Sequence, residues 1–197
     1  MSRDHKEIPA TGWFIKNLPN LMTLLNMLSG LTVLYLSIGM GGQNYAGLSC
    51  LLIIVAVVVD VFDGALARWL GTESDLGKQL DSFADLISFG LAPIAVLLTV
   101  EPIGATPALL PILAFYPVAG AFRLARFNLG DYTAYFVGLP ITAAGLIQAC
   151  FLLLLNRIIL PARWAVASVA LLTAALSLLM VSTFKINKVK VDGRNKR

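Results

Sequence analysis

Four aspartates stand close together in a sequence that is otherwise strongly apolar. Asp60, Asp63, Asp81 and Asp85 fall within the stretch DVFDGALARWLGTESDLGKQLDSFAD. Residues three or four positions apart share one face of a helix, so Asp60 and Asp63 would line one helix and Asp81 and Asp85 another. Where two such faces meet, the four carboxylates come within a few ångströms of one another. They cannot all stay ionised there unless cations neutralise them.

Divalent cations are the first candidates for that neutralisation. Oxygen-rich sites select hard ions such as Mg²⁺ or Mn²⁺, and a site with four carboxylates has room for two of them. Gly64, Ala67 and Gly77 lie on the same faces, where small residues leave space for a ligand or allow close helix packing. Two other interpretations stay open: a buried cluster of salt bridges with nearby Lys and Arg, and an ion or proton site in a transporter.

Other reactive side chains offer little alternative chemistry. The single histidine, His5, lies in a polar N-terminal stretch, which excludes a His-based metal site and a His-activated nucleophile. Both cysteines, Cys50 and Cys150, fall inside apolar runs, where a thiol behaves as a small hydrophobe. The carboxylates are therefore the groups expected to do chemistry.

The elements that position these aspartates are predicted to be membrane-spanning helices. Of the 197 residues, 58% are hydrophobic and 13% are charged, and the mean hydropathy is +0.81. The apolar runs are each long enough to cross a hydrocarbon core of about 30 Å as a helix. We expect an all-α integral membrane protein with six transmembrane helices, at about 20–38, 45–70, 76–100, 108–126, 135–155 and 164–184.

This reading divides the chain into three parts. Residues 1–19 are expected to form an amphipathic segment at the membrane interface, residues 20–184 the six-helix catalytic domain, and residues 185–197 a basic cytoplasmic tail. Ser74 or Asp75 is expected to cap the third span. The tail is expected to contact anionic lipid headgroups rather than to form a specific site.

The distribution of basic residues predicts the orientation in the membrane. Lys and Arg gather on the cytoplasmic side of membrane proteins. With the N-terminus inside, thirteen of the 15 basic residues fall on that side, and only Arg157 and Arg163 fall outside. Both termini and the aspartates are then cytoplasmic, in a multi-pass protein of the cell membrane. The net charge of +4 reflects this topology, and nucleic-acid binding is not expected.

The aspartate stretch resembles the signature of a known enzyme family. Its pattern, with fixed residues at Asp60, Asp63, Gly64, Ala67, Arg68, Gly77, Asp81 and Asp85, matches the CDP-alcohol phosphotransferases without departure. The resemblance implies a bundle of six transmembrane helices, two divalent ions, a homodimer, and displacement of CMP from a CDP-linked lipid by an alcohol.

Further blocks of the chain resemble one branch of that family. The segments LPNLMTLLNMLSG at 18–30, SFGLAP at 88–93, FRLARFN at 122–128 and GLPITAAG at 138–145 are similar to those of integral-membrane phosphatidylserine synthases. This similarity implies transfer of the phosphatidyl group from CDP-diacylglycerol to L-serine. Other acceptors, such as glycerol 3-phosphate, inositol phosphate or a polyol, stay open.

The resemblance also implies roles for individual residues. Asp60, Asp63 and Asp81 would bind one metal ion, and Asp63, Asp81 and Asp85 would serve the second. The cytidine diphosphate would be held by residues of the first, second and third helices, namely Thr23, Asn26, Gly64, Arg68 and Ser74.

We predict that Asp85 acts as the general base. A serine hydroxyl is a poor nucleophile near neutral pH and needs a base within hydrogen-bond reach. No Ser, Cys or His is placed to form a covalent intermediate, so a single in-line displacement is expected.

The acceptor would be bound by polar residues beside the aspartates. Arg123 and Arg126 share a helical face at the same membrane side, where an arginine fork suits the serine carboxylate or a lipid phosphate. Asn128 and Ser88 are further candidates. Membrane anchoring by the two arginines, and plain helix packing by Ser88, are the alternatives.

An ion-coupled transporter is the competing hypothesis from another class. Transporters usually contain repeated halves with broken helices at the membrane midplane. Here the acids gather at one end of one helix pair, and the later spans hold no second copy. The sequence therefore favours an enzyme.

Overall fold

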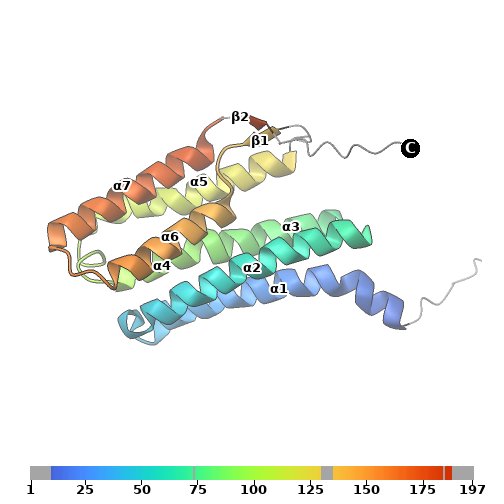
Figure 1. Cartoon of the computed structure of the whole chain (residues 1–197), viewed down its shortest axis with the longest axis horizontal. Helices are drawn as coiled ribbons and strands as arrows, with labels where there is room; N and C mark the ends of the chain where they lie inside the picture. Colours follow the sequence, from blue (N-terminus) through green and yellow to red (C-terminus); the bar gives the residue numbers. More distant parts are fainter. Residues whose placement is uncertain (1–9, 73, 130–134, 184, 188–197) are drawn as a thin grey trace, which may run out of the picture.

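The computed structural model describes residues 10–72, 74–129, 135–183 and 185–187. The chain folds into a bundle of long helices with a two-stranded sheet at one end (Figure 1). The main helices, in chain order, are α1 (Ala10–Gly39), α2 (Ala46–Leu70), α3 (Asp75–Asp85), α4 (Ala92–Thr99), α5 (Leu110–Leu129), α6 (Ile141–Leu155) and α7 (Ala162–Val181). Short helical turns η1 (Gly42–Tyr45) and η3 (Pro107–Leu109) precede α2 and α5, and a π-helical segment, η2 (Leu86–Leu91), joins α3 directly to α4.

Six apolar helical segments match the predicted spans. Five of them are long and apolar enough to cross a membrane, and α3, η2 and α4 together form one of these five. The sixth, α6, is apolar but has only 15 residues. The prediction of an all-α multi-pass membrane bundle is confirmed; the only strands in the described part are β1 (Tyr135–Val137) and β2 (Lys185–Asn187), which pair antiparallel.

The fifth span begins later than the sequence predicts. We expected a helix from residue 135, but residues 135–137 form β1 and α6 begins at Ile141. Gly138 has a φ of +72°, and Pro140 stands at the N-cap position. A glycine in the left-handed conformation lies outside the α-helical region, and a proline has no amide hydrogen to donate to a preceding turn. A helix therefore cannot run continuously through Gly138 and Pro140.

The helix ends near the aspartates follow from local sequence. Gly71, with a φ of +60°, ends α2, and its amide donates to carbonyl oxygens of the last helical turn. Ser74 caps α3, because its side-chain oxygen accepts a 3.0 Å hydrogen bond from the amide of Gly77. This cap confirms the predicted start of the third span, and α1 packs against both α2 and α3.

The core of the bundle lies around η2. Helix α1 packs along α2, α5 packs along α7, and η2 contacts α1, α5 and α6 (Figure 1). Phe89 in η2 and Tyr116 in α5 are fully buried, whereas many large apolar side chains point outward. An apolar exterior on a bundle of this kind is typical of a membrane protein.

The predicted division into three parts stays a prediction. Residues 1–9 and 188–197 lie outside the described residues, so most of the proposed tail and half of the proposed interfacial segment do too. From Ala10 the chain is already helical and continues through Pro19 into the first span.

Candidate active site

Three of the four aspartates form a compact carboxylate cluster between α2 and α3. Each of Asp60, Asp63 and Asp81 offers a carboxylate oxygen, and these oxygens all lie within 4.8 Å of one another. Asp63 is 4% exposed, and the other two side chains are half-buried. The two helix faces therefore meet as the three- and four-residue spacing predicts.

Polar side chains from α1 and α6 donate hydrogen bonds to the carboxylates of the cluster. Thr23 donates from Oγ1 to Oδ2 of Asp63 at 2.9 Å, and Asn26 donates from Nδ2 to Oδ1 of Asp60 at 3.3 Å. Thr142 in the first turn of α6 donates from Oγ1 to Oδ2 of Asp60 at 3.2 Å. Both oxygens of Asp60 thus have a donor, which fixes the orientation of its carboxylate.

Thr142 is a site residue that the sequence analysis missed. It belongs to the GLPITAAG segment, but we assigned that segment no contact with the aspartates. The available signal was a hydroxyl residue just after Pro140, at the same end of the bundle as the acids. In a helix that begins at residue 135, as we predicted, Thr142 would lie two turns from the helix start. In the structure it lies in the first turn.

Asp85 lies beside the cluster rather than within it. Its side chain is 7% exposed, and its carboxyl group interacts with that of Asp60. The charge of Arg123 acts on both Asp85 and Asp60. Asp85 thus shares the surroundings of the cluster but contributes no oxygen to the compact group of three.

The donor set fits a hard divalent cation. It consists of carboxylate oxygens, and two further oxygens in this region, Oδ1 of Asn26 and Oδ1 of Asp85, are buried without a hydrogen-bond partner in the described part of the chain. The salt-bridge interpretation is not supported, since the salt bridge found among the described residues joins the exposed Lys78 and Asp75. Ligand oxygens held by neutral hydroxyl and amide donors are typical of metal sites.

The residues predicted to hold the cytidine diphosphate lie around the same end of α2 and α3. Thr23 and Asn26 contact the aspartates directly. Arg68 is exposed on the last turn of α2, and its charge acts on Asp63. A side-chain carbon on Gly64 would lie 3.5 Å from Nη1 of Arg68, so the missing side chain leaves room between the helix and the guanidinium group.

Three of the four predicted acceptor-binding residues make contacts within the bundle. Arg126 donates to the carbonyl oxygens of Val181 at 3.0 Å and Ser182 at 3.2 Å, at the end of α7. Asn128 donates to the hydroxyl of Ser82 at 2.9 Å, and Ser88 donates to the carbonyl of Asn26 at 2.8 Å.

Arg123 has different surroundings. Its Nε is buried without a hydrogen-bond partner in the described residues, and its charge acts on the aspartates. A role for any of the four in binding the acceptor stays a prediction, and the surroundings favour Arg123 for it.

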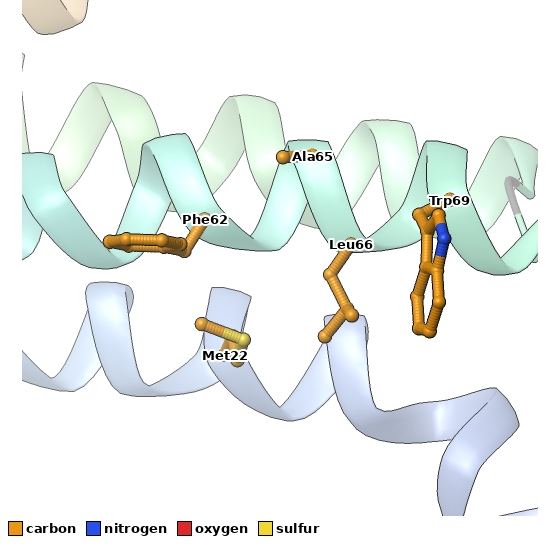
Figure 2. A pocket seen from close by; sticks show the side chains of 5 residues that line it. All are labelled: Met22, Phe62, Ala65, Leu66 and Trp69. Carbon is orange, nitrogen blue, oxygen red and sulfur yellow. The ribbon is translucent and has the colours of Figure 1, made fainter.

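An apolar groove runs along the outer side of α1 and α2, next to the aspartates in sequence. It is lined by Met22 of α1 and by Phe62, Ala65, Leu66 and Trp69 of α2, and its volume is about 330 Å³ (Figure 2). Leu66 and Trp69 point from α2 toward α1 in Figure 2, and the Phe62 ring lies along α2. The lining residues alternate with Asp63, Gly64 and Arg68, so one stretch of α2 presents a polar face to the site and an apolar face to the groove.

Several known proteins are similar to this chain. A protein of Mycobacterium leprae is 39% identical over 71% of this chain and 47% of its own length. One of Methanocaldococcus jannaschii is 34% identical over 85% of this chain and 72% of its own, and one of Bacillus subtilis is 33% identical over 88% and 91%. All three are named CDP-diacylglycerol–serine O-phosphatidyltransferase. The chain spans about half the length of the mycobacterial protein.

The family comparison covers nearly all of the helical bundle. The family model described as CDP-alcohol phosphatidyltransferase matches residues 16–181, from within α1 to the end of α7. This range includes the carboxylate cluster, its hydrogen-bond donors and Asp85. The chain therefore belongs to the CDP-alcohol phosphatidyltransferase family.

Proposed function

We propose that this protein transfers the phosphatidyl group of CDP-diacylglycerol to the hydroxyl group of L-serine and releases CMP. The observation that carries the proposal is the group of three carboxylates within 4.8 Å, with a fourth, buried carboxyl beside it. The names of the similar bacterial and archaeal proteins support serine as the acceptor.

The proposed site holds divalent metal at the carboxylates. Asp60, Asp63 and Asp81 would hold one Mg²⁺ or Mn²⁺, and Asp63, Asp81 and Asp85 would serve a second. Bound metal would neutralise the charge of the diphosphate and polarise its phosphorus–oxygen bonds. Thr23, Asn26 and Thr142 support this role, because they orient the carboxylates without adding charge.

The reaction is an in-line displacement in one step. The serine oxygen forms a bond to the lipid-side phosphorus, and the bond from that phosphorus to the oxygen of CMP breaks. Asp85 accepts the proton of the serine hydroxyl. Arg68 binds the cytidine diphosphate together with Gly64 and Ser74, and its positive charge stabilises the negative charge that develops on the departing CMP.

The membrane supplies one substrate and the aqueous phase the other. We place the carboxylate end of the bundle at the cytoplasmic side, where soluble serine reaches it.

An acyl chain of the lipid donor would lie in the apolar groove of α1 and α2 (Figure 2), which is open and shares α2 with the site. Ala65→Phe should then raise the KM for long-chain CDP-diacylglycerol more than that for a short-chain analogue; an equal change for both would contradict this placement.

The proposed function is tested by CMP release from purified protein. The protein is supplied with CDP-diacylglycerol, Mg²⁺ or Mn²⁺, and a panel of alcohols containing serine, glycerol 3-phosphate, inositol phosphate and a polyol. We expect release with serine only. Release with another acceptor alone would contradict serine, and no release with any acceptor would contradict the enzyme.

Two further features follow from the family resemblance. The enzyme is expected to be a homodimer, which the mass of the detergent-solubilised protein measured by light scattering would test. The single displacement predicts that no phosphatidyl-enzyme accumulates without serine, and trapping such a species would contradict it.

A further inference from the structure

The third span changes its helical form directly after Asp85. Segment η2 is π-helical, and the amide of Ala92 at its end donates to the carbonyl of Ile87, five residues earlier. A π-turn contains more residues than an α-turn, so it rotates the helix before it relative to the helix after it. The direction in which α3 presents Asp85 therefore depends on η2.

The sequence explains why the helix departs from α-form at this place. Pro93 has no amide hydrogen to offer to the carbonyl of Phe89, four residues earlier, and its ring would clash with that carbonyl in a regular α-helix. Tyr116 of α5 supplies a donor instead, since its hydroxyl lies 3.2 Å from the Phe89 oxygen. Tyr116 and Phe89 are both 0% exposed. A buried tyrosine hydroxyl and a buried carbonyl each need a partner, and here they satisfy each other.

Helices α1 and α6 hold the same segment from other sides. Ser88 of η2 donates to the carbonyl of Asn26, whose side chain in turn donates to Asp60. A side-chain carbon on Gly30 would lie 2.5 Å from the Ser88 hydroxyl, and one on Gly145 would lie 2.8 Å from Cβ of Phe89. The approach of both neighbouring helices to η2 therefore requires glycine.

We propose that Tyr116 is a positioning residue for the reaction. Its hydroxyl holds η2 in the π-helical form through Phe89, and this form sets the direction from which the Asp85 carboxyl enters the site. The proposal rests on the proposed function, because the role of Asp85 as base is part of that function. Tyr116 itself belongs to the interior of the bundle and acts through the backbone of η2.

The first test compares Tyr116→Phe with a matched control, Tyr35→Phe. Both variants lose one hydroxyl, but Tyr35 is 63% exposed on α1. For Tyr116→Phe we expect kcat to fall by about 10- to 100-fold, as a displaced catalytic group predicts. The KM for CDP-diacylglycerol and the affinity for CMP should change by less than about 2-fold, because Asp85 adjoins η2 directly, whereas Gly64 and Arg68 lie on α2 and Ser74 lies at the far end of α3. Tyr35→Phe should match wild type in all of these values.

The outcomes separate this proposal from the proposed function. Wild-type protein that releases no CMP would contradict the proposed function. Active wild-type protein together with an unchanged kcat in Tyr116→Phe would overturn only the positioning role. A parallel loss of CMP binding and of CDP-diacylglycerol binding would also overturn it, since that result indicates a general packing defect.

A second variant covers the case in which Tyr116→Phe does not fold. Pro93→Ala restores the missing amide hydrogen, so the carbonyl of Phe89 gains a donor within its own helix and η2 can return toward α-form. We expect kcat to fall in Pro93→Ala with CMP binding retained, and we expect Tyr116→Phe to add little in that background, because contacting residues are not additive. Unchanged kcat in Pro93→Ala, or losses that multiply in the double variant, would overturn the proposal.

Discussion

Asp85 differs from the other three aspartates in the position of its carboxyl group. Asp60, Asp63 and Asp81 share a compact set of oxygens, whereas Asp85 lies beside them and interacts with Asp60. This arrangement suits a division of labour in which three carboxylates chiefly hold metal and the fourth also takes a proton. Asp85→Asn keeps the shape of the side chain and removes its basicity. We therefore expect kcat to fall by about 10²- to 10⁴-fold while binding of CDP-diacylglycerol persists.

The control for this variant lies on the same helix. Asp75→Asn makes the same chemical change at an exposed residue that pairs with Lys78 at 3.9 Å. Exposed pairs of this kind contribute little, so its kcat should stay close to that of wild type. Near-normal turnover in Asp85→Asn would rule out Asp85 as the base.

Thr142 is expected to matter because it orients a carboxylate. Its hydroxyl donates to Asp60 at 3.2 Å, opposite the Asn26 amide that donates to the other oxygen. Thr142→Val keeps the branched shape but removes this donor, and loss of such a contact typically lowers metal affinity about 10- to 100-fold. Titration of Mn²⁺ into the purified protein measures this change without requiring turnover.

Two further variants test whether the hydroxyl itself is responsible. Thr142→Ser keeps the donor and should bind Mn²⁺ nearly as well as wild type. Thr32→Val makes the same substitution at an exposed residue of α1 that bonds only within its own helix, and should have no effect. Equal Mn²⁺ affinity in Thr142→Val and wild type would contradict the orienting role.

At the scale of elements, Arg126 joins the end of α5 to the end of α7. Its guanidinium group donates to the carbonyls of Met180, Val181 and Ser182, which the last turn of a helix leaves without amide partners. Arg126→Ala should therefore lower the free energy of unfolding by about 2–3 kcal/mol, as expected for hydrogen bonds to a charged group. Thermal melting in detergent measures the loss.

Arg126→Ala also decides between this structural role and the acceptor role predicted from sequence. As a companion variant, Arg126→Lys keeps the charge but not the planar fork, so it should recover only part of the stability. A capping role predicts lowered melting temperature with a near-normal KM for serine. A strongly raised KM for serine with unchanged melting would instead support acceptor binding.

The sequence predicted those features that depend on periodicity and spacing. The six apolar segments and the meeting of Asp60, Asp63 and Asp81 follow from residues that are close in sequence and connected by a short turn. The predicted start of α6 was wrong, because residues 135–140 are mostly apolar and Gly138 and Pro140, which interrupt the helix, were not given weight.

Contacts between distant segments could not be predicted in the same way. Tyr116 bonds to a carbonyl 27 residues away, Thr142 bonds to an acid 82 residues away, and Arg126 bonds to carbonyls more than 50 residues away. Each of these contacts depends on how whole helices pack, and for Tyr116 and Arg126 the acceptor is a backbone carbonyl that every residue possesses. Such acceptors leave no mark in a sequence pattern.

At the scale of the whole molecule, the bundle has two chemically different ends. The carboxylate cluster, Arg68, Arg123 and Arg126 belong to one end, and Arg157 and Arg163 follow α6 at the other. Between the ends, the outward-facing side chains are mostly apolar. Because basic residues gather at the cytoplasmic side of a membrane, the carboxylate end should face the cytoplasm.

Chemical labelling from one side of the membrane tests this orientation. Lys78, near the start of α3, and Arg157, after the end of α6, are exposed at opposite ends and can each be replaced by cysteine in a protein whose Cys50 and Cys150 are changed to alanine. A membrane-impermeant maleimide should label Lys78→Cys in inverted vesicles, which expose the cytoplasmic face, and Arg157→Cys in right-side-out vesicles. Retained CMP release would verify that both variants are folded. The opposite labelling pattern would place the carboxylates on the external side and contradict the predicted orientation.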